Sequence, residues 1–119
     1  MTTIAWAQAV DLSIPNDTEH ALATVPLERL DVDQPVLIAV YVFVGTPDAD
    51  ISAQDVRVRR DTVVGEQVGP TSNLVGNVIP VFVDPAGQPR ERSYVLTLEL
   101  VNAAGASTGV NALIAAIHN

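Results

Sequence analysis

The sequence predicts an all-β fold, an antiparallel β-sandwich formed as one domain by residues 1–119. Short segments rich in β-branched residues recur at fairly regular intervals, and turn-forming residues separate them. Signals that start or stop helices are scarce. The chain has 119 residues, 48% of them hydrophobic. A single domain of this size buries roughly two-thirds of the surface that its unfolded chain exposes.

The first two segments have different roles in the predicted sandwich. Residues 2–10 (TTIAWAQAV) alternate bulky with small side chains, as a strand does when its two faces differ. Residues 21–32 (ALATVPLERLDV) contain Pro26, which has no N–H to donate within a central ladder. We therefore expect an edge strand or a bulge in the second segment.

Two further segments are apolar on both faces. Residues 35–44 (PVLIAVYVFV) place a row of valine and isoleucine on one face, and Leu37, Tyr41 and Phe43 on the other. Residues 76–85 (GNVIPVFVDP) show the same character. A sandwich strand with one solvent-exposed face would alternate apolar and polar residues. A second layer or a neighbouring subunit is therefore expected to cover the second face.

Polar alternation marks the remaining internal strands. Residues 56–60 (VRVRR) and 62–68 (TVVGEQV) are predicted as two strands separated near Asp61. Residues 93–101 (SYVLTLELV) put tyrosine and leucines on one face and polar side chains on the other, which is the clearest pattern of a half-buried strand in the chain.

The last segment, residues 110–119 (VNALIAAIHN), fits both strand and helix spacing. We predict a strand that follows 93–101 across a hairpin loop, because the intervening NAAGASTG contains two glycines suited to such a loop. A helix capped by Ser107 or Thr108 is the alternative.

Residues 105–109 (GASTG) match the G-x-S-x-G pattern of many hydrolases. That pattern requires a strand-to-helix turn, with an acid and then a histidine further along the chain. No Asp or Glu follows Ser107, and His118 is expected at the far end of the same arm. We therefore interpret the motif as a loop and expect no catalytic residues and no enzymatic activity.

No metal or cofactor is expected either. The absence of cysteine excludes disulfides and the common structural zinc sites, and two isolated histidines do not form a zinc pattern. Asp48, Asp50 and Asp55 lie close together in the sequence, but they lack the glycine and distal glutamate of an EF-hand. Whether they bind calcium is left open.

The charge balance restricts the partners. Six arginines, no lysine and 14 acidic residues give a net charge of −8, which opposes binding to nucleic acid and to anionic membranes. The longest apolar run, residues 36–44, is nine residues long, too short to span a bilayer. The N-terminus lacks the basic start of a signal peptide. We expect a soluble protein that is made in the cytoplasm without a signal peptide.

Arg57, Arg59 and Arg60 form the one dense basic cluster. Asp55 and Asp61 flank it, so the plainer interpretation is local ion pairing on a wet sheet face. The alternative is that these arginines dock onto an acidic partner, because a planar guanidinium suits carboxylates.

The order of segments resembles the trimeric jelly rolls of the tumour-necrosis-factor-like superfamily. The resemblance is to small members found on bacteriophage virions and at the ends of bacterial collagen-like proteins. It is carried by a tryptophan-containing first strand (IAWAQAV), the stretch IPNDTEHALATVPL, a doubly apolar strand, SYVLTLELV and the final NALIAAIHN. An immunoglobulin-like sandwich is the alternative fold, although its tryptophan lies on a central strand and Trp6 is on the first.

This resemblance implies a homotrimer. In that family the first and last strands lie side by side in a sheet that faces the threefold axis. Six apolar residues are accordingly expected at the trimer interface: Trp6, Leu37, Tyr41, Phe43, Leu113 and Ile117.

The function expected first is that of a non-enzymatic structural protein, a trimeric decoration, cement or fibre-head module on the surface of a bacteriophage virion. It would bind a repeating protein lattice such as a capsid or tail. The expected docking residues are Thr2, Thr3, Ile4, Ala5, Arg57, Arg59 and Arg60. The alternative is a carbohydrate-binding or adhesion module, for which Trp6, Tyr41 and Tyr94 are the available aromatic side chains.

Overall fold

The computed structural model describes residues 3–15, 18–26, 35–46, 53–73, 81–84, 93–101 and 105–118. These ranges form eight β-strands and no helix. The strands are β1 (Thr3–Ile14), β2 (Glu19–Pro26), β3 (Val36–Thr46), β4 (Ala53–Arg60), β5 (Gln67–Asn73), β6 (Val81–Asp84), β7 (Ser93–Val101) and β8 (Ser107–His118). No helix in the described ranges has the length and hydropathy needed to cross a bilayer.

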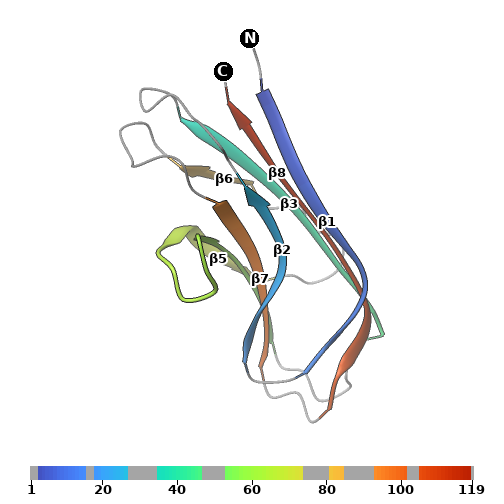
Figure 1. Cartoon of the computed structure of the whole chain (residues 1–119). Coiled ribbons are helices and arrows are strands. Elements are labelled where there is room, and N and C mark those ends of the chain that lie inside the picture. The colour runs from blue at the N-terminus through green and yellow to red at the C-terminus, as the bar shows by residue number, and fades with distance from the viewer. Residues whose placement is uncertain are drawn as a thin grey trace.

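Two four-stranded antiparallel sheets pack against each other (Figure 1). Sheet A has the strand order β1-β8-β3-β6, and sheet B has the order β2-β7-β4-β5. This arrangement is an eight-stranded jelly roll. The predicted antiparallel β-sandwich is confirmed, and the first and last strands lie side by side in sheet A. The order differs from the A-B-E-D and C-F-G sheets of an immunoglobulin domain.

The hydrophobic core lies between the two sheets. β3 contributes its valine and isoleucine face, which is almost completely buried, and the leucines of β7 meet it from sheet B. The largest fully buried side chains are Ile38, Leu96, Leu98, Leu100, Ile114, Val25, Val36, Val40, Val42, Val56, Val58 and Val110. β-Branched residues suit such a pleated, buried surface.

The second segment behaves as expected for an edge strand. β2 lies at the edge of sheet B, its register shifts between Ala21 and Ala23, and it ends at Pro26. The segment 76–85 is represented by the short strand β6, and its remaining residues lie outside the described ranges.

The strand predicted at 62–68 is wrong. A tight turn occupies residues 61–66, and β5 begins only at Gln67. Asp61 has a φ of 69°, and the Arg60 N–H donates to the carbonyl of Glu66 (2.9 Å). A Cβ on Gly65 would lie 1.8 Å from the Arg60 carbonyl oxygen, so this turn accepts only glycine at that position.

The hairpin predicted between 93–101 and 110–119 is also wrong, although both segments are strands. β7 pairs with β2 and β4, whereas β8 pairs with β1 and β3, so the chain passes from one sheet to the other between them. The helical alternative for the last segment is wrong as well. Ser107 is the first residue of β8, opposite Ile14, and is buried. It does not lie in the strand-to-helix turn that a nucleophile elbow requires.

Candidate functional site

The outer face of sheet A is an apolar surface formed by ten residues. They are Ile4, Trp6, Leu37, Ala39, Tyr41, Phe43, Val83, Leu113, Ala115 and Ile117. The strand registers bring them together in rows. Ile4 lies opposite Ile117, Ile117 opposite Leu37, and Leu37 opposite Val83, so one apolar row crosses all four strands.

Two further rows lie beside the first. Trp6 of β1 lies opposite Ala115 of β8, which is itself opposite Ala39 of β3. In the next row Leu113 lies opposite Tyr41 and, on its other side, Gln8. Small alanines thus lie beside Trp6 in its own row, and larger side chains occupy the two neighbouring rows.

The large side chains of this face are exposed in the single chain. Trp6 is 62% exposed, Ile4 60% and Val83 54%, while Leu37, Phe43 and Leu113 are also exposed. Strand spacing and rise give the face a plan area on the order of 400 Å². The largest contiguous apolar patch on a typical soluble monomer is of about this size and is often functional.

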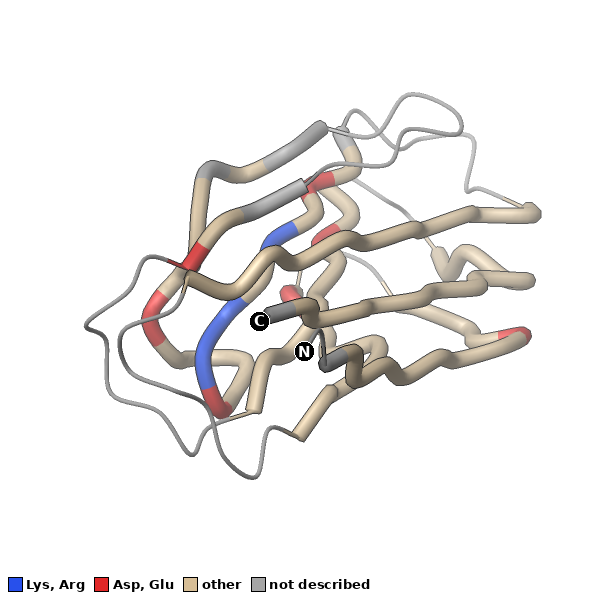
Figure 2. The backbone as a smooth tube through the Cα atoms, turned by 90° about the horizontal axis from the view of Figure 1, so that it is seen from above, with Lys and Arg blue, Asp and Glu red and all other residues tan. Residues whose placement is uncertain are grey.

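Charge is absent from the outer face of sheet A. Among the described strands of this sheet only Asp11 and Asp84 are acidic, and there is no arginine or lysine. Asp84 is buried, and Asp11 lies at a β-bulge beyond the rows, where its N–H donates to Asn111 Oδ1 (2.9 Å). Figure 2 shows the contrast: the arginines lie together on the other sheet, and the long strands of sheet A are nearly free of charge.

The structure brings all six predicted trimer-interface residues onto this one face. Trp6 comes from β1, three residues come from β3, and Leu113 and Ile117 come from β8. Sequence reasoning missed Val83, and it assigned Ile4 to docking. Alternation in residues 2–10 showed that one side of β1 is bulky, but not that this side points outward while Ala5 and Ala7 pack against the core.

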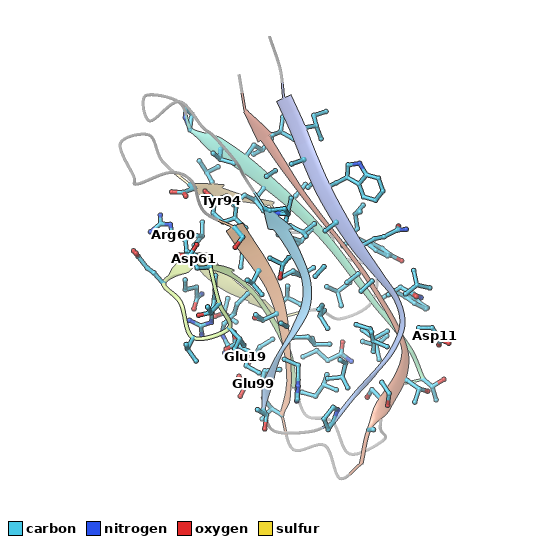
Figure 3. All side chains as sticks on the ribbon, in the orientation of Figure 1. Asp11, Glu19, Arg60, Asp61, Tyr94 and Glu99 are labelled. Atoms are coloured by element: carbon cyan, nitrogen blue, oxygen red, sulfur yellow. The ribbon has the colours of Figure 1, made fainter. Side chains whose placement is uncertain are left out.

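The outer face of sheet B carries a network of charged side chains centred on Glu19. Arg59 binds the Glu19 carboxylate through two hydrogen bonds, from Nε to Oε2 (2.6 Å) and from Nη2 to Oε1 (2.9 Å). Thr97 donates to Oε2 (2.7 Å). Arg57 donates to Glu19 (3.3 Å) and to Glu99 (2.8 Å), and the two acids lie near each other in Figure 3. The network therefore links β2, β7 and β4.

The pKa of Glu19 is lowered by this network. Burial of the carboxyl group is the largest single influence and raises the pKa, but the hydrogen bonds from Arg59 and Thr97 and the charges of Arg59 and Arg57 together outweigh it. The folded state thus holds Glu19 as the carboxylate.

Protein stability should therefore fall as the pH drops through the acidic range. A group whose pKa is lowered on folding contributes stability above its unfolded pKa, here about 4.5, and this contribution is lost as the pH falls through the folded pKa. Glu19→Gln should flatten the decline of the free energy of unfolding below pH 5, measured by urea denaturation at several pH values. Glu66→Gln, at a 70% exposed side chain, is the control that retains Glu19. An unchanged slope in Glu19→Gln would contradict this assignment.

A second charged cluster lies in the interior. Arg60 of β4 donates to Asp84 of β6 through Nη2 (2.7 Å) and Nε (3.4 Å), and the Tyr94 hydroxyl donates to the same carboxylate. All three residues are buried. Arg60 and Tyr94 lie close together in Figure 3. The cluster joins sheet B to the edge strand of sheet A.

The predicted docking residues do not form one surface. Ile4 is exposed, Ala5 packs against the core, and Thr2 lies outside the described ranges. Thr3 begins β1, opposite His118. The structure favours the local ion pairing of the arginine cluster, with Glu19, Glu99 and Asp55 as partners of Arg57 and Arg59.

Arg60 argues most clearly against docking, because its guanidinium is buried against Asp84 and only its Nη1 reaches the exposed Glu66 (2.7 Å). Tyr94 is also buried, so it offers no aromatic surface to a glycan. Asp48 and Asp50 lie outside the described residues. Within the described ranges no three His, Asp or Glu side chains gather as metal ligands, and Asp55 pairs with Arg57 (3.5 Å).

Fold and surface together define a jelly-roll domain with one charged sheet and one exposed apolar sheet. No family model and no curated protein matches the chain. Among solved structures, it is similar to the one titled "Crystal Structure of FLHE", with 11% sequence identity and a TM-score of 0.58. The match covers 97% of this chain and 96% of that chain. At this identity the likeness shows the fold alone.

Proposed function

We propose that the protein is a non-enzymatic structural module that forms a homotrimer through the outer face of sheet A. The observation that carries this proposal is the contiguous, charge-free apolar surface on a sheet whose other side already faces the core. Burying about 400 Å² of apolar surface contributes on the order of 10 kcal/mol before the costs of association.

The charge distribution supports contact between identical copies at this face. Each chain carries a net charge of −8, so two copies repel each other over most of their surface. The outer face of sheet A is a place where copies can meet without bringing acidic side chains together. The charged face of sheet B then remains on the outside of the assembly.

The trimer's role, in this proposal, is to decorate a repeating protein surface, such as a bacteriophage capsid or tail. Two features support a passive structural role. The charged side chains of sheet B are paired within the chain, and the serine of the hydrolase-like motif is buried in a strand. Of the predicted docking residues, Ile4 is exposed in the single chain, but it belongs to the outer face of sheet A that the proposed trimer covers.

The mass in solution tests the assembly. Sedimentation equilibrium of the native protein at micromolar concentration should give three times the chain mass of 12.6 kDa. A monomer at these concentrations would overturn the proposal. Imaging of the particle that carries the protein, with density for trimers on a lattice, tests the second part.

A glycan-binding module is the second candidate, and one observation favours it. Trp6 is largely exposed on the outer face of sheet A, as an aromatic platform for a sugar ring would be. A monomer that binds glycans, and loses binding in Trp6→Ala, would favour this function over the structural one.

A further inference from the structure

The sandwich has four sheet edges, and they differ in how they are protected. β1 and β6 are the end strands of sheet A, and β2 and β5 are those of sheet B. An end strand presents unpaired N–H and C=O groups, which can pair with a strand of another chain. Proteins block such pairing with short strands, prolines, charges and bulges.

Three of the edges carry these protective features. β6 is only four residues long. β2 carries Glu19, a register irregularity between Ala21 and Ala23, and a terminal proline. β5 contains Gly69 with a φ of 73°, which departs from extended backbone, and Pro70, which has no N–H.

β1 lacks this protection over most of its length. It is twelve residues long, and residues 3–10 (TIAWAQAV) contain no charge and no proline. Its first irregularity is the bulge near Asp11, where φ is 58°. The regular part from Thr3 to Ala9 keeps an unbroken register with β8 on its other side.

We propose that β1 of a second copy of this chain adds to this edge in antiparallel orientation, which joins two copies of sheet A into one continuous sheet. The edge requires an extended, uncharged strand whose bulky side chains continue the outer face. β1 itself has this chemistry, and a twofold axis perpendicular to the sheet pairs two identical strands antiparallel. A strand that carries an acidic residue would instead bring two carboxylates close together when it pairs with its own copy.

This contact is distinct from the proposed trimer interface, because it uses the backbone edge of β1 and not the side chains of the outer face of sheet A. In the pair, Ile4, Trp6 and Gln8 of both copies remain on the same side of the sheet. Together with a threefold contact, the twofold contact would link trimers into hexamers or into an array. This part of the inference rests on the proposed function; the strand pairing does not.

Disulfide trapping tests the pairing directly, because the native chain has no cysteine. Ile4→Cys, Trp6→Cys and Gln8→Cys are oxidised singly and in equimolar mixtures, and Leu37→Cys on β3 of the same face is the control. Directly opposed residues of paired strands lie within disulfide reach, and residues one register step further apart do not.

In a single antiparallel register, every pair of directly opposed residues has the same sum of residue numbers. We therefore expect cross-links only between cysteine positions that share one such sum. Leu37→Cys, which lies in the proposed trimer interface, should not cross-link once Leu113→Glu has removed the trimer. Absence of β1 cross-links, or cross-linking of every variant with itself, overturns the proposal. The first outcome includes the case in which the edge takes up a strand of a different protein.

A second background separates this inference from the trimer. The same cysteine series is made with Leu113→Glu, which charges the centre of the outer face of sheet A at an exposed position. Loss of the trimer with β1 cross-links retained supports strand pairing and shows that it is independent of the face. A wild-type trimer without β1 cross-links rejects the pairing and leaves the proposed function standing. Circular dichroism confirms that each variant is folded.

Discussion

Asp84→Ala is expected to lower the free energy of unfolding by about 3–5 kcal/mol, because it removes the buried carboxylate that pairs with the Arg60 guanidinium and leaves only the mostly exposed Glu66 as its partner. The hydrogen bond from the Tyr94 hydroxyl to this carboxylate is lost in the same step. Small domains are stable by roughly 5–15 kcal/mol in total, so this single change removes a large fraction of the stability. Urea denaturation at one fixed protein concentration measures the loss.

The matched control acts on the other end of the same arginine. Glu66 pairs with Arg60 Nη1 but is mostly exposed, so Glu66→Ala should cost no more than about 1 kcal/mol. Tyr94→Phe should lie between the two, because it removes one hydrogen bond and no charge. Equal losses for Asp84→Ala and Glu66→Ala would show that the interior cluster does not hold the sheets together.

Phe43→Asp is expected to convert the proposed trimer into monomers. Phe43 lies on the outer face of sheet A at an exposed position, so the single chain can accept an aspartate there, whereas the trimer would bury three unpaired carboxylates. Burial of an unpaired charge costs several kcal/mol. Each 1.4 kcal/mol weakens association about tenfold. Sedimentation equilibrium measures the change in mass.

Val64→Asp is the control for this variant. Val64 is 87% exposed in the turn between β4 and β5, away from the outer face of sheet A, and the substitution makes the same change from apolar to acidic. It should leave the mass unchanged. A Phe43→Asp protein that stays trimeric and equally stable would exclude this face as the interface.

Local patterns in the sequence predict much of this fold. The two apolar faces of residues 35–44 correspond to the core side and the outer side of β3, and Pro26 marks an edge strand. The six expected interface residues share one face because alternation within a strand determines which side chains point the same way. Those inferences depend on spacing within one strand.

Features that depend on distant parts of the chain could not be predicted in this way. Arg60 and Asp84 are 24 positions apart, and no local pattern indicates that they meet in the interior. The predicted hairpin is absent because β7 and β8 belong to different sheets, and turn residues do not reveal which strand a segment pairs with. The turn at Gly65 depends on the close approach of its backbone to the Arg60 carbonyl. The valines beside Gly65 favour a strand, so the local sequence does not indicate this turn.

The pairing of β1 with β8 also sets the order in which this chain can fold. Thr3 lies opposite His118, so sheet A stays incomplete until residues 107–118 have left the ribosome. Closing a loop of this length costs more entropy than closing the short turn between β4 and β5, the described pair of consecutive strands that lie in one sheet. Folding should therefore begin in sheet B around that turn and be slow for a chain of this size, as it is for domains rich in non-local pairs. Until β8 has been synthesised, β1 has two free edges and no charge before Asp11, and the nascent protein is most exposed to aggregation during that interval.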